Sequence, residues 1–448
     1  MKERLARPLA AQGPARPPPV PPFRLNSKKV LTFLEFSLNF MSMIERTSTP
    51  IIGEIIETLN KMAFVSGPRQ VGKTTLAKKY QEHFGQSLYV NWDSISHRKK
   101  LLADPLFFQK ENRNPDKPFL VVFDELHKYA RWKNYLKGIY DESKDEFRFL
   151  ITGSGRLELF KKGGDSLLGR YFSVPLLPLS MGELSNKLTG LSEFKKSLEA
   201  PPASSAETKD RYEQLFRFSG FPEPFSRGSV AFYNRWFSER KTLLLREDIR
   251  DTTAIREISL LEHLAHLIPE RIGSPLSINS LKGDVGVAFE TIRDWVLILE
   301  QFFYLFRVAP FTGRLTRTLR KETKVYLYDW VEVEKESFRF ENFVALHLLK
   351  ATRLWKAMGE ADTGLHYLRD KEKREVDFVL TEKGKPFCLV ECKAREEELS
   401  PHLVHFQKKL TVPFAIQLVH KSGVCKKLRE EKLTRWVISA DRWLSALP

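Results

Sequence analysis

The sequence is poor in cysteine and has no long apolar run. Only three cysteines occur among 448 residues, namely Cys388, Cys392 and Cys425. Three are too few for a disulfide framework and do not have the spacing of zinc ligands, so the composition fits the reducing cytoplasm. No stretch of about 18 uncharged apolar residues occurs, so the sequence predicts neither a transmembrane helix nor a membrane partner.

Acidic residues are also scarce relative to basic ones. The 56 Asp and Glu residues face 73 Lys and Arg residues, which gives a net charge of +17. Such an excess favours a polyanionic partner, and we expect DNA or RNA; a basic protein without such a partner is the alternative. The contents of 42% hydrophobic and 29% charged residues are ordinary for a folded protein.

The first 40 residues are rich in arginine and proline and do not read as globular. We expect a disordered tail or a start codon placed too early, with Met41 or Met43 as the true start. An organellar transit peptide is a weaker interpretation, because seven prolines by Pro22 oppose an amphipathic helix.

Residues 41–193 have the pattern of an α/β domain. Three apolar runs, at 63–67, 119–125 and 147–155, each end in polar residues, as buried parallel strands do at their carboxyl ends. Helical text separates the runs.

Three further regions follow. The Pro, Ala and Ser content of residues 194–210 predicts a linker or a surface loop. Residues 211–310 look helical, with two helical patterns around Gly286, as in a helix-turn-helix followed by a wing. Short strands return in residues 311–448, in KVYLYD, REVDFVL, PFCLVECKA and PFAIQLV.

A phosphate-binding loop follows the first apolar run. Residues 67–74 match G-x-x-x-x-G-K-[ST] between a strand and a helix, as this motif requires. The glycines let backbone N–H groups surround phosphates, the lysine reaches the β and γ oxygens, and the hydroxyl reaches Mg²⁺. We expect ATP to be bound by Gly67, Pro68, Arg69, Gln70, Val71, Gly72, Lys73, Thr74 and Thr75.

The other two runs end in candidate catalytic residues. Asp124 would join Thr74 in the Mg²⁺ shell, and Glu125 would polarise the attacking water, unless this pair only caps a helix. Ser154, at the end of the third run, is a candidate sensor of the γ-phosphate. Arg170 is a candidate to stabilise the transferring phosphoryl group, in its own subunit or in a neighbour, although a surface role is the alternative.

These motifs resemble those of the prokaryotic AAA-type ATPases that carry an extra C-terminal domain. The similar blocks are SGPRQVGKTTLAKKY, VVFDELHK, ITGSGRLEL, LLGRYFSVPLLPLSMGE and SGFPEP, in the order of that family. The resemblance covers residues 45 to 420. It implies an AAA+ ATPase core, a winged-helix region, a domain with the restriction-endonuclease (PD-(D/E)XK) fold, and assembly of a homo-oligomeric ring.

The tail contains a D…ExK arrangement. Glu391 and Lys393 share one face of a strand, and Asp377 on the partner strand of a hairpin can meet them. Such a set can bind Mg²⁺ through its carboxylates while the lysine stabilises a hydroxide or phosphate. The resemblance adds Glu341 to this metal site. Because related domains keep the fold without cleavage, nuclease activity stays open.

The helix over residues 289–302 is a candidate DNA-recognition helix with Arg293 as its clearest contact. Arg314, Arg317, Arg320 and Lys321 could flank the phosphate backbone. The alternative is a packing module, because the LILEQFF segment is apolar.

Two hypotheses result. The first is an ATP-hydrolysing enzyme that acts on DNA, with or without a metal-dependent nuclease. The rival is a nucleotide-switched module that binds DNA or protein and whose nuclease-like domain does not cleave.

Overall fold

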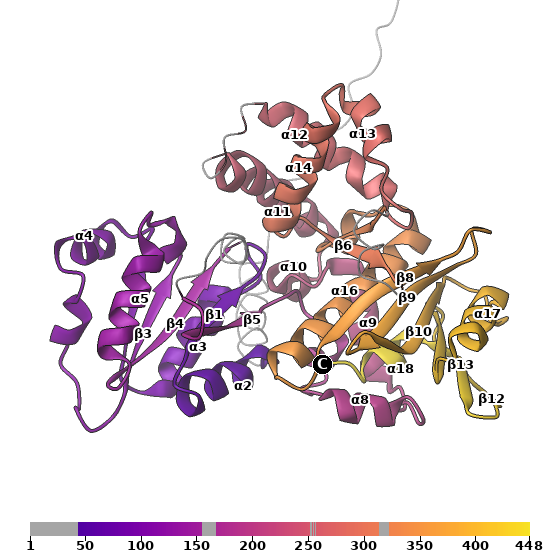
Figure 1. Cartoon of the computed structure of the whole chain (residues 1–448), viewed down its shortest axis with the longest axis horizontal. Helices are drawn as coiled ribbons and strands as arrows, with labels where there is room; N and C mark the ends of the chain where they lie inside the picture. The colour runs from indigo at the N-terminus through magenta and orange to yellow at the C-terminus, as the bar shows by residue number, and fades with distance from the viewer. Residues whose placement is uncertain (1–43, 155–166, 251–252, 254, 256, 313–321) are drawn as a thin grey trace, which may run out of the picture. The chain divides into compact units, whose positions relative to one another are not determined.

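The computed structural model describes residues 44–154, 167–250, 253, 255, 257–312 and 322–448. Its amino-terminal part contains a parallel five-stranded sheet in the order β2-β3-β4-β1-β5 (Figure 1). The strands are β1 (Met62–Ser66), β2 (Ser87–Asn91), β3 (Phe119–Asp124), β4 (Phe147–Gly153) and β5 (Tyr171–Pro175). Because they all run in one direction, their carboxyl ends form a single edge. The α/β class predicted for this part is confirmed.

Alternating side chains of these strands pack into two hydrophobic cores. Along β3, Leu120 and Val122 belong to one core, whereas Val121 and Phe123 belong to the other. Central strands that are covered on both faces consist of continuous apolar runs. For this reason β1, β3 and β4 can be predicted from the sequence. The first core lies under α2 (Ser48–Gly53), η1 (Glu54–Thr58) and α3 (Lys73–Phe84), and the second under α4 (Ile95–Ala103) and α5 (Trp132–Ser143).

Helices make up most of residues 181–301. Gly286, with a φ of 78°, ends α13 in the left-handed conformation, and α14 begins three residues later. The two helices predicted around this glycine are therefore confirmed. In the described residues no helix is both long and apolar enough to cross a bilayer. The elements are α7 (Met181–Leu184), α8 (Leu191–Ser197), α9 (Ala206–Phe218), α10 (Pro222–Arg227), α11 (Val230–Thr242), η5 (Leu243–Ile249), α12 (Ile258–Leu267), α13 (Ile278–Val285) and α14 (Phe289–Gln301).

The segment predicted to be a linker or surface loop, residues 194–210, contains the end of α8, a connection without regular structure and the start of α9. Phe194 of α8 is fully buried against Trp355 and Trp443. The carbonyl of Leu198 accepts a hydrogen bond of 2.8 Å from Nε1 of Trp436. The Pro, Ala and Ser residues lie mainly in the connection between α8 and α9, residues 198–205, most of which are at least partly exposed. The connection is therefore a surface loop, and the helices on either side of it are packed.

The carboxyl-terminal part contains a mixed eight-stranded sheet in the order β12-β13-β11-β10-β9-β8-β6-β7 (Figure 1). Strand β6 belongs to this sheet although it precedes residue 311, where the sequence placed the domain boundary. The four predicted strands are confirmed as β7, β9, β10 and β11. The strands are β6 (Leu305–Pro310), β7 (Lys324–Leu327), β8 (Thr363–Arg369), β9 (Glu375–Glu382), β10 (Lys385–Lys393), β11 (Phe414–Val419), β12 (Cys425–Glu430) and β13 (Leu433–Ser439), and the helices are α16 (Glu336–Ala357), α17 (Pro401–Leu410) and α18 (Ala440–Leu444).

A buried carboxylate joins these parts of the fold. Glu183 of α7 is fully buried, and its Oε1 accepts hydrogen bonds from Nε of Arg46 at 3.0 Å and from the backbone N of Thr47 at 3.1 Å. Its other oxygen accepts a hydrogen bond from Nζ of Lys350 in α16. Arg46 also donates to the carbonyl of Val71, in the loop after β1, at 2.9 Å. One carboxylate therefore ties the segment before α2 and the loop after β1 to helix α16.

The charge of Glu183 contributes to stability over a defined pH range. Burial raises the pKa of this carboxyl group, but Arg46 and Lys350 outweigh burial and hold the pKa at about 2, below the ordinary value of 4.5. Because the folded-state pKa is depressed, the contribution is fully present above pH 4.5 and is lost as the pH falls towards 2.

The substitution Glu183→Gln should lower the free energy of unfolding by about 3 kcal/mol at pH 7, because two buried cations lose their counter-charge. Urea unfolding measures this. The control Glu199→Gln removes the partner of Lys427 from a half-exposed ion pair and should cost less than about 1 kcal/mol. The difference in the free energy of unfolding between wild type and Glu183→Gln should become smaller as the pH falls from about 5 towards 2. A difference that does not change with pH would show that the charge of Glu183 is not the cause.

Candidate functional site

The loop between β1 and α3 has a backbone suited to an anion. Gln70 and Gly72 have φ angles of 64° and 99°, and turns of this left-handed kind let successive N–H groups face one concavity. A Cβ at Gly67 would lie 1.9 Å from the carbonyl oxygen of Leu176, so only glycine fits there. Helix α3 begins directly afterwards at Lys73 and adds the positive end of its dipole.

The Lys73 side chain lies within this loop. Its ammonium donates hydrogen bonds to the carbonyls of Gly67 at 2.9 Å and Pro68 at 2.8 Å. Burial lowers the pKa of Lys73, and the nearby carboxylates of Glu125 and Asp124 oppose that shift. A bound anion would offset the same desolvation cost.

Asp124, the last residue of β3, is held by three hydroxyl groups. Thr74 of α3 donates to its Oδ2 at 2.8 Å, and Tyr89 of β2 donates to the same oxygen. Thr152 of β4 donates to Oδ1. Only 2% of Asp124 is exposed, so these contacts fix the orientation of the carboxylate. Sequence reasoning did not identify Tyr89 and Thr152 as partners of Asp124, because the contacts form only in the folded chain.

Glu125 lies beside Asp124 in a strained conformation. Its φ of 57° is unusual for a residue other than glycine, and such strain is often found at functional positions. Burial raises the pKa of Glu125, against the effect of Lys73 and Lys128. Ser154 follows β4 at the same edge of the sheet, because Thr152 pairs in register with Asp124. The structure therefore brings Lys73, Asp124, Glu125 and Ser154 to one edge.

A carboxylate from the helical region also reaches the loop. Oδ1 of Asp248 in η5 lies 2.6 Å from Nη1 of Arg69, and Oε2 of Glu247 lies 4.0 Å from Nη2. Burial raises the pKa of Asp248, and Arg69, Lys128 and Lys73 oppose this shift. The sequence offers no signal for this contact, since the residues are far apart in the chain.

Arg170 lies at the opposite edge of the sheet from the loop. It precedes Tyr171, which pairs with Met62 at the start of β1, whereas the loop follows Ser66 at the end of β1. The length of β1 separates the two positions by about 16 Å. Nε of Arg170 lies 2.7 Å from Oδ1 of Asp141. The predicted role for Arg170 in its own subunit is therefore wrong; a role in a neighbouring subunit stays a prediction.

Two of the three predicted metal ligands of the carboxyl-terminal domain, Glu341 and Asp377, contact a lysine. Lys324 of β7 is fully buried, and its Nζ lies 2.6 Å from Oε1 of Glu375, 3.1 Å from Oε1 of Glu341 and 3.5 Å from Oδ1 of Asp377. The hydroxyl of Tyr326 donates to Oε1 of Glu341 at 2.7 Å. We call these five residues the Lys324 cluster.

Glu391 and Lys393 form a pair beside this cluster. Nζ of Lys393 lies 3.2 Å from Oε1 of Glu391, whose residue is 6% exposed. Burial and the carboxylate of Asp377 raise the pKa of Glu391 to about 8. Oδ2 of Asp377 accepts a hydrogen bond of 2.8 Å from the backbone N of Cys392. The D…ExK residues therefore lie near one another, as expected from the strand pattern.

A magnesium site made of Glu341, Asp377 and Glu391 is nevertheless not assembled. The ammonium of Lys324 contacts both Glu341 and Asp377, while Lys393 pairs with Glu391. Within the described residues, no group of three or more His, Cys, Asp and Glu side chains could hold a metal ion. Sequence reasoning did not identify Lys324, because this lysine precedes the D…ExK motif by more than 50 residues.

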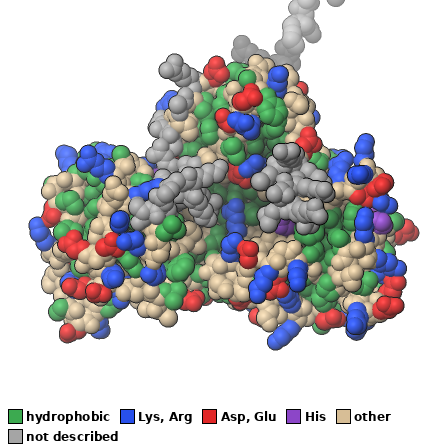
Figure 2. Space-filling model, in the orientation of Figure 1, with side chains coloured by type: hydrophobic (Ala, Val, Ile, Leu, Met, Phe, Trp, Pro, Cys, Tyr) green, Lys and Arg blue, Asp and Glu red, His purple; other side chains and the backbone are tan. Residues whose placement is uncertain are grey.

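The candidate DNA-recognition helix is α14. Its Arg293 is exposed and contacts the neighbouring Asp294 at 3.0 Å, whereas the opposite face of the helix is buried. In the face that Figure 2 shows, Lys and Arg side chains are interspersed with Asp and Glu. The other predicted contacts, Arg314, Arg317, Arg320 and Lys321, lie outside the described residues.

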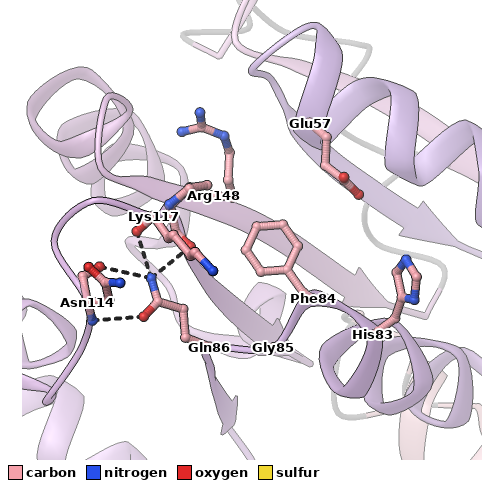
Figure 3. Close-up of a pocket in the computed structure, with 9 residues that line it drawn as sticks. Glu57, His83, Phe84, Gly85, Gln86, Asn114, Lys117 and Arg148 are labelled. Carbon is pink, nitrogen blue, oxygen red and sulfur yellow. Dashed lines mark hydrogen bonds between the residues drawn. The ribbon is translucent and has the colours of Figure 1, made fainter.

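A separate cavity of about 550 Å³ lies at the amino edge of the first sheet (Figure 3). Nε2 of Gln86 donates to the carbonyls of Asn114, Lys117 and Pro118, so this amide holds the loop before β3. The cavity is distinct from the phosphate loop, which lies at the other edge. It is lined by Glu57, His83, Phe84, Gly85, Gln86, Asn114, Lys117, Pro118 and Arg148.

Two known proteins are similar in sequence to this chain. "Uncharacterized protein MJ1637" of Methanocaldococcus jannaschii is 23% identical over 295 residues, which are 59% of this chain and 60% of that protein. "Uncharacterized protein Rv2008c" of Mycobacterium tuberculosis is 20% identical over 333 residues, 73% of this chain and 69% of that protein. This chain thus matches about three fifths of the length of the first relative.

Two solved structures are similar at low sequence identity. The Walker-type ATPase PABY2304 of Pyrococcus abyssi gives a TM-score of 0.42 at 14% identity and covers 65% of this chain and 95% of its own. AMPPCP-bound DnaA from Aquifex aeolicus gives a TM-score of 0.28 at 14% identity, with 56% and 86% covered.

Three families match successive parts of the sequence. Residues 209–330 match a domain of unknown function (DUF8612), and residues 337–443 match another (DUF4143). Residues 59–185, which contain the five-stranded sheet and the phosphate loop, match the AAA domain family. This chain therefore contains an AAA-type P-loop ATPase domain.

Proposed function

We propose that this protein hydrolyses ATP and uses the hydrolysis to act on DNA. One observation carries the proposal: Lys73, Thr74, Asp124 and Glu125 meet at one edge of the sheet, next to a loop whose backbone suits an anion. The low cysteine content agrees with a cytoplasmic location.

The loop residues and Lys73 would bind the phosphates of ATP. Lys73 now donates to two backbone carbonyls, and phosphate oxygens are stronger acceptors for an ammonium group. Its position within the loop lets it reach the β and γ oxygens without leaving the site.

Thr74 and Asp124 would hold the magnesium ion. Their oxygens lie 2.8 Å apart and are the hard ligands that Mg²⁺ prefers, and phosphate oxygens would complete the shell. When bound, Mg²⁺ would neutralise charge on the β- and γ-phosphates. Tyr89 and Thr152 would keep the Asp124 carboxylate oriented throughout.

Glu125 would accept the proton of the attacking water. Burial raises its pKa towards the working pH, which makes its carboxylate a stronger base than an exposed glutamate. Ser154, at the end of the adjacent strand, would help to position the γ-phosphate or the water.

Arg170 would complete the site of a neighbouring subunit. Its place at the far edge of the sheet prevents contact with ATP in its own chain, so the proposal requires a homo-oligomer. The catalytic effect of such an arginine is electrostatic stabilisation of the transferring phosphoryl group.

DNA is the partner that the charge favours. The net charge of +17 and the two-helix unit α13–α14 support it. The rival proposal is a nucleotide-switched module that binds DNA or protein and whose carboxyl-terminal domain does not cleave. The Lys324 cluster favours the absence of cleavage.

A single assay separates these proposals. Supercoiled DNA is incubated with wild type, Lys73→Ala and Asp377→Ala, with and without ATP and Mg²⁺, while phosphate release and nicking are followed together. We expect phosphate release by wild type and by Asp377→Ala, and its loss in Lys73→Ala. The absence of phosphate release by wild type would refute ATP hydrolysis.

Complementation tests the role of Arg170. Arg170→Ala and Lys73→Ala should each lose at least 90% of the phosphate release, or about 1.4 kcal/mol of transition-state stabilisation. Mixed subunits should recover part of it, because some sites then pair an intact loop with an intact arginine. The control Arg271→Ala breaks a similar exposed pair with Asp284 and should have no effect. If mixing restores nothing while the variants co-assemble, Arg170 does not act between subunits.

Asp248 should compete with ATP for Arg69. Asp248→Asn should tighten ATP binding about fivefold, because breaking a half-buried ion pair of about 1 kcal/mol frees Arg69 for phosphate. Isothermal titration measures the Kd. Glu247→Gln, at 4.0 Å from Arg69 and more exposed, is the matched control and should change the Kd less than twofold. Weaker ATP binding by Asp248→Asn would mean that Asp248 positions Arg69 instead.

A further inference from the structure

We infer that Lys324 is a built-in cation, so that the carboxyl-terminal domain works without a divalent metal and does not cleave DNA. The ammonium lies within 3.5 Å of one carboxylate oxygen each of Glu341, Glu375 and Asp377. The inference concerns this domain alone and does not depend on ATP hydrolysis.

The backbone around Lys324 fixes its position. Lys324 pairs with Val308 of β6 on one side and with Pro275 on the other. The backbone N of Leu276 donates to the carbonyl of Thr323 at 2.8 Å. Because the strand is held on both sides and the side chain is fully buried, the ammonium cannot swing into solvent.

The cluster encloses the ammonium as a coordination shell would enclose a metal. Carboxylate oxygens from α16 and β9 surround it, and its Nζ lies 5.7 Å from the centre of the Tyr367 ring. A divalent cation at the same place would meet the positive charge of a fully buried ammonium at close range. The oxygens that would bind it are already hydrogen-bonded.

The remaining oxygens do not offer a second site. Oδ2 of Asp377 accepts from Cys392, and Oε1 of Glu391 contacts Lys393. Oε2 of Glu341 lies against the backbone of Gly273, because a Cβ atom built on this glycine would be only 3.2 Å from that oxygen. Oε2 of Glu391 is the one buried oxygen of these carboxylates for which the described structure shows no hydrogen-bond partner. One such oxygen falls short of the several that Mg²⁺ or Mn²⁺ requires.

Counting bound Mn²⁺ by electron paramagnetic resonance, without nucleotide, tests this inference. Wild type, Asp377→Asn, Lys324→Met and the double variant Lys324→Met with Asp377→Asn are titrated with MnCl₂. Lys324→Met keeps the length of the side chain and removes the charge. Lys195→Met is the matched control, because Lys195 pairs with Glu382 of the same sheet at 2.6 Å but faces one carboxylate.

We expect wild type and Asp377→Asn to bind Mn²⁺ equally. Lys324→Met should gain one Mn²⁺ per chain with at least tenfold higher affinity than wild type, and the double variant should lose it. Lys195→Met should behave as wild type. A wild-type Mn²⁺ site that Asp377→Asn abolishes would overturn the inference, and so would a folded Lys324→Met protein without the new site.

A second readout keeps the test decisive if Lys324→Met does not fold. Wild type alone should not nick supercoiled DNA in Mg²⁺ or Mn²⁺ beyond the level of Asp377→Asn. Nicking that depends on Asp377 would overturn the inference. Phosphate release by the same samples reports on the proposed ATPase separately.

Discussion

The buried charge of Glu183 is the constraint on which the rest of the structure depends. A carboxylate without access to water is stable only beside cations, and Arg46 and Lys350 supply them from segments about 300 residues apart in the sequence. Arg46 also donates a hydrogen bond to a carbonyl of the phosphate loop, and Lys350 belongs to the helix that carries Glu341. One ion network therefore connects the phosphate loop to the helix that supplies a carboxylate to the Lys324 cluster.

The parallel sheet gives the ATPase domain two chemically different edges. The carboxyl edge holds the loop, Asp124 and Glu125, while the amino edge holds Arg170 and the cavity of Figure 3. A site that needs an arginine from the amino edge can obtain it only from another chain. The position of Arg170 within one subunit therefore means that the proposed ATP hydrolysis requires a homo-oligomer.

The sequence predicts the parts of the site that are contiguous. The phosphate loop is a single run of residues, and Asp124 and Glu125 follow an apolar strand, so pattern alone finds them. Edge strands β2 and β5 have no continuous apolar run because they are half exposed, and the sequence does not reveal them.

Contacts between distant segments are equally hidden. Tyr89, Asp248 and Lys324 reach their partners only in the folded chain, and each carries an ordinary polar side chain that no motif marks. Lys324 changes the interpretation most, because the D…ExK pattern is present while its Asp377 contacts Lys324 and its Glu391 contacts Lys393. The D…ExK motif shows which side chains come together, whereas the lysines that contact their carboxylates decide whether a metal ion can bind.

The central claim is that Glu125 activates water for ATP hydrolysis at this edge of the sheet. The most direct measurement is single-turnover phosphate release by wild type and Glu125→Gln, with the ATP affinity of both determined in parallel. We expect Glu125→Gln to bind ATP within about threefold of wild type and to release phosphate at least about 100-fold more slowly, which is the usual contribution of a general base. Equal rates of phosphate release by the two proteins would contradict it.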